Sequence, residues 1–322
     1  MQTKVILICS LTAALLSSAH AQYVTVGDPG NPNDPVTGSL YGGVATTYAI
    51  GTYEVTINEY AEFLNAAAAT DTYALYNPSM ASDLNSAGIA RANSPGSYSY
   101  SVIPGSGNKP VTYVSFYDAM RYANWLGTGS TETGAYTLLG GTAVPSNGLT
   151  VTRNGGAQVW IPSENEWYKA AYYDPSAGGP ADAYWLYPMR SDAVPASSTN
   201  RGNFYDGDYA VTRSGSYSVT QNYLTSVGAY TDSASYYGTF DQGGNVWEWN
   251  DTIIGSARGR RGGSWDYGQS GLQASFRYGD GPTVEADYIG FRVATVPEPT
   301  VSVSLLLAGG LLLARRKRPS AL

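Results

Sequence analysis

The near absence of cysteine and histidine constrains the fold of this chain most. The 322-residue sequence has one cysteine, Cys9, and one histidine, His20. Both lie in residues 1–21, which have the basic, apolar and small-residue parts of a secretory signal peptide. The apolar part is shorter than the roughly 20 residues of a membrane span, so we expect cleavage before Gln22 rather than a permanent anchor. The mature chain then folds without disulfides, and it has no thiolate, imidazole or Cys/His zinc site.

The composition favours an irregular fold and an acidic surface. The sequence has 38 Gly and 28 Tyr, while charged residues make up only 13%. This mixture predicts long loops held by aromatic side chains. Five of the 18 Lys and Arg lie outside residues 22–299, so 13 of them face 25 Asp and Glu there, a net charge of −12. Such a charge argues against nucleic acid as a partner and is compatible with calcium and with neutral or cationic glycans.

The C-terminal segment, residues 296–322, carries a second targeting pattern. Val296-Pro297-Glu298-Pro299 precedes an apolar stretch over residues 301–314 and the basic cluster Arg315-Arg316-Lys317-Arg318. These parts resemble a PEP-CTERM sorting signal, although a plain tail anchor is the alternative. The resemblance implies an exosortase-type peptidase as a partner, with transfer to the cell surface or an extracellular matrix. The basic cluster predicts a transient inner-membrane stage with the chain's end in the cytoplasm.

Between these ends, capping residues predict three helices. Thr56 or Asn58 starts the first, which we expect to end near Ala69; Ser115 starts the second. Ser163 and Glu166 form a capping box for the third. Short strands are expected over residues 48–56, 244–249 and 261–265, and the domain closes with residues 290–294. Residues 81–107 are expected to form a surface loop, and residues 174–237 little regular structure.

Six short motifs occur in order along the chain. They are Tyr53-Glu54-Val55-Thr56, Pro110-Val111-Thr112-Tyr113-Val114-Ser115, Ile161-Pro162-Ser163-Glu164-Asn165-Glu166-Trp167, Asp241-Gln242-Gly243-Gly244-Asn245-Val246-Trp247-Glu248-Trp249, Arg261-Gly262-Gly263-Ser264-Trp265 and Gly290-Phe291-Arg292. Together they resemble the formylglycine-generating enzyme family, also called the sulfatase-modifying factor domain. The resemblance covers residues 40–295, after a loop segment over residues 22–39. It implies an α+β fold, the family's variant of the C-type-lectin fold, with a small twisted antiparallel sheet, few helices and extensive ordered loops.

The resemblance also raises doubt about activity. True members oxidise a sulfatase cysteine to formylglycine with two cysteines and copper, placed just after the Gly-Gly-Ser-aromatic turn. Here Tyr267 and Leu272 stand at those positions. Neither side chain binds copper(I) or exchanges thiol electrons. The related sulfoxide synthases hold iron through histidines, which the mature chain lacks. We therefore expect no copper, iron or zinc site, and we expect a protein that is not this family's oxidase.

Calcium is the cofactor that the resemblance still implies. Ca²⁺ takes six to eight oxygen ligands from carboxylates, amides and carbonyls. The expected set is Asp241 and Glu248 with the carbonyls of Gly244 and Val246. A second site would use Asn203 and the carbonyl of Phe204, with a later partner near Asn222. The alternative is that Asn245 and Glu248 only brace the turn through hydrogen bonds.

The remaining motif residues have structural and functional interpretations. We expect Arg261 and Arg292 to pair with carboxylates such as Glu166 or Glu248, and the tryptophans to lie in the core. The segment that lines the substrate groove in true members predicts a peptide or glycan groove here, and a surface loop packed on itself is the alternative. Its candidate residues are Trp265, Tyr267, Leu272, Phe276, Arg277 and Tyr278.

Three functions are compatible with these features. The favoured one is a non-catalytic binding module at the cell surface, stabilised by calcium. The second is an enzyme with other chemistry, for which Asp266 and Asp280 could act as acid and base. The third is a structural matrix protein that binds only itself.

Overall fold

The computed structural model describes residues 22–177 and 183–297. The predicted signal peptide and the part of the predicted sorting signal beyond Pro297 lie outside these residues. Within the described ranges, no helix is both long and apolar enough to cross a membrane.

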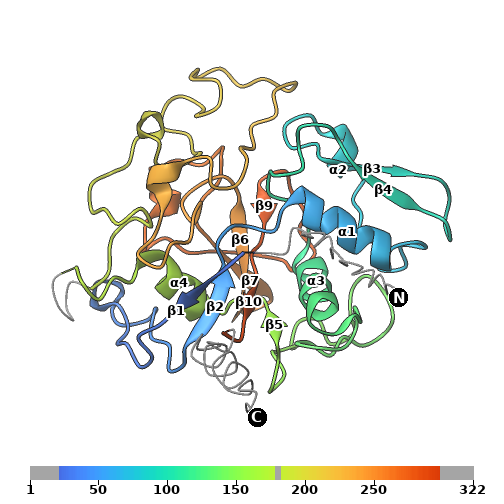
Figure 1. Ribbon diagram of the computed structural model, residues 1–322, viewed down its shortest axis with the longest axis horizontal. Coiled ribbons are helices and arrows are strands. Elements are labelled where there is room, and N and C mark those ends of the chain that lie inside the picture. The colour runs from blue at the N-terminus through green and yellow to red at the C-terminus, as the bar shows by residue number, and fades with distance from the viewer. Residues whose placement is uncertain (1–21, 178–182, 298–322) are drawn as a thin grey trace, which may run out of the picture.

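Two small four-stranded sheets organise the domain (Figure 1). The first has the order β1 (Tyr23–Val26), β2 (Tyr48–Gly51), β10 (Ala294–Thr295) and β5 (Val159–Trp160), all antiparallel. The second has the order β8 (Tyr278–Asp280), β7 (Ala257–Arg261), β6 (Trp247–Ile254) and β9 (Ile289–Gly290). In the second sheet β6 and β9 are parallel, and the other pairs are antiparallel. Because β10 lies between β2 and β5, the last described strand joins a sheet whose first strand begins at Tyr23.

Three helices begin where the capping residues predicted. They are α1 (Ile57–Ala67), α3 (Phe116–Thr128) and α4 (Glu164–Tyr172). The side chains of Thr56, Ser115 and Ser163 each accept a hydrogen bond from the backbone N–H three residues later. The acidic side chain at that later position accepts one from the backbone N–H of the capping residue. These local bonds satisfy backbone donors that would otherwise lack partners at each helix start.

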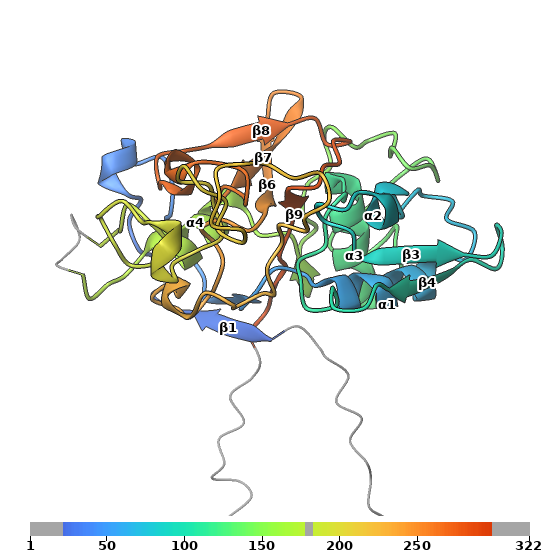
Figure 2. The same ribbon diagram turned by 90° about the horizontal axis from the view of Figure 1, so that it is seen from above.

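The expectation of a surface loop over residues 81–107 is wrong. The short helix α2 (Ser79–Ser82) overlaps its start, and β3 (Ile89–Ala92) and β4 (Ser99–Val102) form an antiparallel hairpin within it. Figure 2 shows this hairpin beside α1. Ile89 and Tyr100 are buried, and the Asn65 amide of α1 donates to the Tyr100 carbonyl. The polar residues that suggested a loop occupy the exposed face and the turn.

The strands of the second sheet are shifted from their predicted positions. The strand expected over residues 244–249 begins at Trp247 and extends to Ile254. The strand expected over residues 261–265 ends at Arg261, because Gly262 and Gly263 have φ values of 101° and 74° that break the extended backbone. The Gly-Gly-Ser-Trp motif is therefore a turn that leaves the sheet.

The long connections are ordered by buried side chains. The described part of residues 174–237 contains only the 3₁₀ turns η2 (Ser197–Thr199) and η3 (Thr231–Ser233), as expected. Further 3₁₀ turns are η1 (Pro35–Thr37) and η4 (Gln269–Leu272). The main core contains aromatic contacts between α1, α3 and the segment after β9, including Tyr60, Phe63, Tyr122 and Phe291. The expectation that Trp160, Trp167, Trp247, Trp249 and Trp265 are core residues is confirmed, since each is at most 7% exposed.

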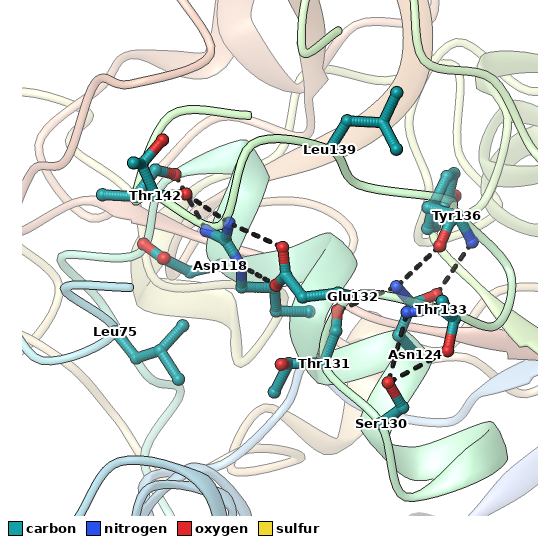
Figure 3. A network of polar contacts seen from close by, with 12 residues as sticks. Leu75, Asp118, Asn124, Ser130, Thr131, Glu132, Thr133, Tyr136, Leu139 and Thr142 are labelled. Carbon is teal, nitrogen blue, oxygen red and sulfur yellow. Dashed lines mark hydrogen bonds and ion pairs between the residues drawn. The ribbon is translucent and has the colours of Figure 1, made fainter. Parts of the chain in front are cut away.

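The loop after α3 shows how such a connection is fixed (Figure 3). Arg121 is buried and donates to Glu132 at 2.7 Å and to the carbonyls of Thr142 and Ala143. One turn further along α3, the Asn124 amide donates to the carbonyls of Thr131 and Tyr136. Arg121 and Asn124 therefore fix the loop at residues 131–143 through hydrogen bonds, in a chain whose single cysteine cannot form an internal disulfide.

Candidate functional site

A buried ion pair lies at the centre of the two sheets' junction. Arg292 Nε and Nη2 lie 2.6 Å from Glu248 Oε2 and Oε1, and both side chains are fully buried. Trp167 Nε1 donates to Glu248 Oε2 at 2.7 Å. The predicted pairing of Arg292 with Glu248 is confirmed. This two-point geometry fixes the start of β6 against the segment after β9.

Arg261 pairs with a different carboxylate from the two expected. Its Nε donates to Glu164 Oε1 at 2.8 Å, and its Nη1 donates to the carbonyls of Ala274 and Phe276. Glu166 is instead occupied by the capping box of α4 and by Arg153. Both acids lie on α4, but only Glu164 faces the end of β7. Side chains two positions apart on a helix point in different directions.

Two more acidic side chains surround the Arg292–Glu248 pair. Glu54 is 2% exposed, and its Oε2 has no hydrogen-bond partner among the described residues. Burial, and then the charge of Asp241, raise the pKa of Glu54 well above its usual value. Burial also raises the pKa of Asp241 to about 6, against the opposing effects of the Gly228 N–H and Arg292. Three buried carboxyl groups therefore face one guanidinium.

The turn before β6 is held by Asn203. Asp241, Gly244 and Asn245 have φ values of 59°, 104° and 62°. The Asn245 N–H donates to the Asn203 carbonyl at 2.7 Å, and the Asn203 amide donates to Asn245 Oδ1. The two segments expected to bind separate calcium ions thus lie against each other. Asn245 braces the turn, as the alternative interpretation held, and also donates to Glu54.

The side chains of two other members of the second expected set have partners of their own. The Phe204 ring is fully buried in a cluster with Tyr187, Met189 and Leu272. Asn222 Oδ1 accepts from Lys109 Nζ at 2.8 Å and from the Leu224 N–H. The Asn222 side chain is therefore engaged in bracing its own loop.

Replacing Gly244 with alanine should destabilise the protein by about 1–3 kcal/mol more than the same change at Gly105. A Cβ at Gly244 would lie 2.4 Å from the Asn203 carbonyl oxygen, whereas at Gly105 it would meet nothing within 4 Å. Both glycines have positive φ values, so alanine at Gly105 has the same unfavourable backbone conformation but no clash. The difference between the two variants therefore measures the effect of the clash. Urea unfolding followed by tryptophan fluorescence measures the difference; equal losses would show that the turn does not need the Asn203 contact.

An aromatic cavity of about 280 Å³ lies beside β7 and β8. Its lining residues are Trp247, Arg260, Asp266, Tyr267, Tyr278 and Tyr288. The Tyr267 ring meets Trp247 edge to face, with centroids 5.2 Å apart. Asp266 accepts from the Ser264 hydroxyl at 2.6 Å, and burial raises the pKa of Asp266. Asp280 pairs with Arg260 rather than with Asp266.

Only Tyr267 and Tyr278 of the six predicted groove residues line this cavity. Phe276 packs behind it, against Trp247 and Tyr267. Trp265 is buried and stacks on Tyr223, with centroids 4.6 Å apart. The other two predicted residues are turned away: Arg277 pairs with Glu164, and Leu272 is fully buried in the cluster with Phe204.

Comparison with known proteins identifies the family. Residues 43–296 match the Sulfatase-modifying factor enzyme 1-like domain, which is most of the described chain. The chain belongs to this family. The solved structure of CarF superposes with a TM-score of 0.50 at 21% identity, covering 86% of this chain and 99% of that one. The match, with the small sheets and few helices, confirms the predicted α+β fold.

Curated relatives of this sulfatase-modifying factor domain are longer proteins. Hercynine oxygenase of Mycolicibacterium smegmatis is 27% identical over 212 residues, which are 58% of this chain and 38% of the relative. Hercynine oxygenase of Mycolicibacterium thermoresistibile is 25% identical over 211 residues, 58% of this chain and 36% of the relative. The chain thus spans less than two fifths of the length of the curated relatives that it matches.

The positions that the resemblance assigns to the family's cysteines have different surroundings in this domain. Tyr267 lines the aromatic cavity, while Leu272 is fully buried behind it. The cavity therefore presents the phenol of Tyr267, and Leu272 is not among its lining residues. The sequence could predict the residue types at both positions, but not that one of them faces away from the cavity.

Proposed function

We propose that this chain is an exported binding module of the sulfatase-modifying factor family that does not perform the family's cysteine oxidation. The observation that supports it best is the cavity at Tyr267, which offers aromatic faces, a guanidinium and a carboxyl group. Aromatic surfaces with a few polar groups are typical of sites that bind small ligands. We expect a peptide or a glycan to occupy this cavity without being chemically changed.

Export and surface retention are part of the same proposal. Their support is the order of sequence features: a signal peptide, one large domain, and a tail with the PEP, apolar and basic parts. An exosortase-type peptidase would remove the tail after a transient stage in the inner membrane. The domain would then remain at the cell surface or in the extracellular matrix.

Calcium is the ion that we propose for the acidic cluster. Three buried carboxyl groups share one guanidinium there, and the unpartnered Glu54 Oε2 is a hard oxygen donor of the kind that Ca²⁺ prefers. The proposed ligands are Asp241 and Glu248 with the carbonyls of Gly244 and Val246, and Glu54 lies beside them. Glu248 Oε1 accepts only from Arg292 among its hydrogen bonds, so a lone pair remains for a cation. Bound calcium would neutralise the cluster and order the turn, while Asn203 and Phe204 remain proposed for a second ion.

Carbonyl oxygens matter for this assignment. In the described ranges, no three His, Cys, Asp or Glu side chains are grouped closely enough to hold a metal ion by themselves. A site with few charged ligands has modest affinity, in the range of extracellular calcium modules. The proposal therefore predicts a calcium effect at millimolar rather than nanomolar concentration.

Chelating calcium should lower the melting temperature of the mature chain. At a free calcium concentration 100 times the dissociation constant, binding adds about 2.7 kcal/mol to the free energy of unfolding. Differential scanning calorimetry in calcium and in EGTA measures the shift, and magnesium serves as the ion control. The shift should disappear in Asp241→Asn and persist in Asp232→Asn, which changes an exposed acid. Identical melting in calcium and EGTA would rule out calcium at this cluster.

Ligand binding is tested on glycan and peptide arrays with the mature chain in mild detergent. We expect selective binding that Tyr278→Ala removes and Tyr236→Ala retains. Tyr278 lines the cavity and is 45% exposed, whereas Tyr236 is 39% exposed and lies outside it. Equal binding by both variants would place the ligand elsewhere, and no binding at all would favour a self-associating matrix protein.

Catalysis by Asp266 is the second candidate, favoured by one observation. Asp266 lines the cavity, and burial raises its pKa, as in many general acids. If an array ligand is converted to product, Asp266→Asn should abolish the conversion while binding continues. If no ligand changes on incubation, this candidate is excluded for those ligands.

A further inference from the structure

Arg260 has unused hydrogen-bonding capacity in the aromatic cavity. Its residue is 4% exposed, yet it lines the cavity. The Nη2 group pairs with Asp280, while Nε and Nη1 have no hydrogen-bond partner among the described residues. A buried donor without a partner is destabilising, because it has lost its hydrogen bonds to water. Two such donors on one side chain indicate that a ligand supplies the missing acceptors.

The sheet fixes where these donors lie. Arg260 is opposite Trp249 of β6 and opposite Tyr278 of β8, in the middle of three adjacent strands. Its guanidinium lies 5.0 Å from the Tyr278 ring centroid and 5.5 Å from that of Trp247. Packing on both sides leaves the side chain little freedom to move to another partner. The donors are therefore oriented before a ligand arrives, which lowers the entropy cost of binding.

The geometry of the Arg260 guanidinium restricts the chemical class of ligand that fits this cavity. Nε and Nη1 lie on either side of the Nη2 group that Asp280 occupies, so they suit two separated oxygen atoms. One of these is best charged, because hydrogen bonds from a guanidinium to a carboxylate are about twice as strong as neutral ones. A doubly charged sulfate or phosphate is less suitable, since Asp280 and Asp266 already place negative charge here.

The rest of the cavity suits a ring with hydroxyl groups. Tyr278 and Trp247 are tilted by 41° with centroids 6.2 Å apart, and Tyr267 closes another side edge to face. The negative faces of such rings attract the C–H groups of a sugar. The Ser264 hydroxyl donates to Asp266 Oδ1. Asp266 Oδ2 can therefore accept a hydrogen bond from a hydroxyl group of the ligand. The volume of about 280 Å³ is small for a ligand site, which favours one ring over an extended peptide.

We infer that this cavity binds a uronate unit of an acidic polysaccharide, with its carboxylate at Arg260 and its ring against Tyr278 and Trp247. The net charge of −12 favours neutral or cationic glycans elsewhere on the surface, so the local positive charge of Arg260 is what selects a uronate here. This inference rests on the proposed binding function and names the ligand class for that site. The second free N–H of Arg260 donates to a ring or hydroxyl oxygen of the same unit. Asp266 accepts from a hydroxyl group on the opposite side.

Isothermal titration of the mature chain with a defined oligogalacturonate and with the matching neutral oligogalactose tests the inference. We expect the uronate to bind at least tenfold more tightly. Arg260→Lys keeps the charge but loses the separated donors, and it should reduce the preference to about twofold or less. Arg258→Lys is the matched control, because Arg258 is buried on the same strand but pairs with Asp251 outside the cavity. Circular dichroism checks that both variants fold.

Each outcome separates the inference from the proposed function. Equal affinity for the two oligosaccharides would overturn the uronate assignment and leave a glycan-binding module. Binding of a peptide but of neither sugar would also overturn it, with the binding function intact. Failure to bind any array ligand would overturn both. An unchanged uronate preference in Arg260→Lys would place the carboxylate at another cation.

Discussion

Replacing Arg292 with leucine should lower the free energy of unfolding by about 3–5 kcal/mol. The substitution leaves Glu248 buried without its partner, and it removes the positive charge that offsets Glu54 and Asp241. A buried ion pair contributes little net stability against apolar replacements, but removing one partner exposes the full desolvation cost of the other. Urea unfolding of the mature chain, followed by tryptophan fluorescence, measures the loss.

Two variants make this result specific. Arg190→Leu breaks an ion pair with Asp174 in which the arginine is 50% exposed, and it should cost at most about 1 kcal/mol. The double variant Arg292→Leu with Glu248→Gln should lose less than the two single losses added together, because the unpaired charge is gone. If the Arg292 and Arg190 variants are equally stable, the buried pair does not organise the fold.

Raising the pH from 4 to 8 should lower the free energy of unfolding of the wild-type protein by up to roughly 4 kcal/mol through ionisation of Asp118. The variant Asp118→Asn should not show this loss. Burial, and then the charge of Glu285, raise the pKa of Asp118 to about 7, while Ser115 and Arg121 oppose the change. A carboxyl group whose pKa is higher in the folded state stabilises the fold below its unfolded pKa near 4. That contribution is lost as the pH rises through about 7. The asparagine resembles the protonated acid and can still accept the Ser115 N–H bond of the capping box.

The measurement is the difference in unfolding free energy between wild type and Asp118→Asn at several pH values. The free energy of unfolding of Asp118→Asn should increase relative to that of the wild type as the pH rises, with most of the change between pH 4 and 7. Asp208→Asn, which alters an exposed acid, should show no such trend. A constant difference for Asp118→Asn across the range would mean that the carboxyl group ionises in the fold as freely as in the unfolded chain.

Local signals in the sequence were enough to predict much of this fold. Thr56, Ser115 and Ser163 mark helix starts because the hydrogen bonds of a cap involve residues three apart. The hairpin of β3 and β4 was missed, since its stability comes from Tyr100 and Ile89 packing on distant elements. Strand pairing of this kind depends on tertiary contacts more than on local composition.

The candidate site was harder to predict for the same reason. The Arg292–Glu248 pair followed from residue type, but Arg261 pairs with Glu164 because of the direction in which α4 presents its acids. Glu54 stands in the first of the six motifs, but nothing in that motif indicated that its carboxyl group is buried beside Arg292. Arg260 was equally inconspicuous among the three arginines of β7. Only the folded chain shows that its donors are buried and unpartnered.

Retention of an unchanged ligand tests the central claim most directly. The mature chain is incubated in air and copper(II) with the ligand selected on the arrays and, separately, with a sulfatase-derived cysteine peptide. Liquid chromatography with mass spectrometry then compares each compound before and after. We predict that the selected ligand is bound and recovered with its mass unchanged, and that the peptide cysteine is not converted to formylglycine. Formylglycine in the peptide, or a product from the bound ligand, would contradict the assignment of a binding module.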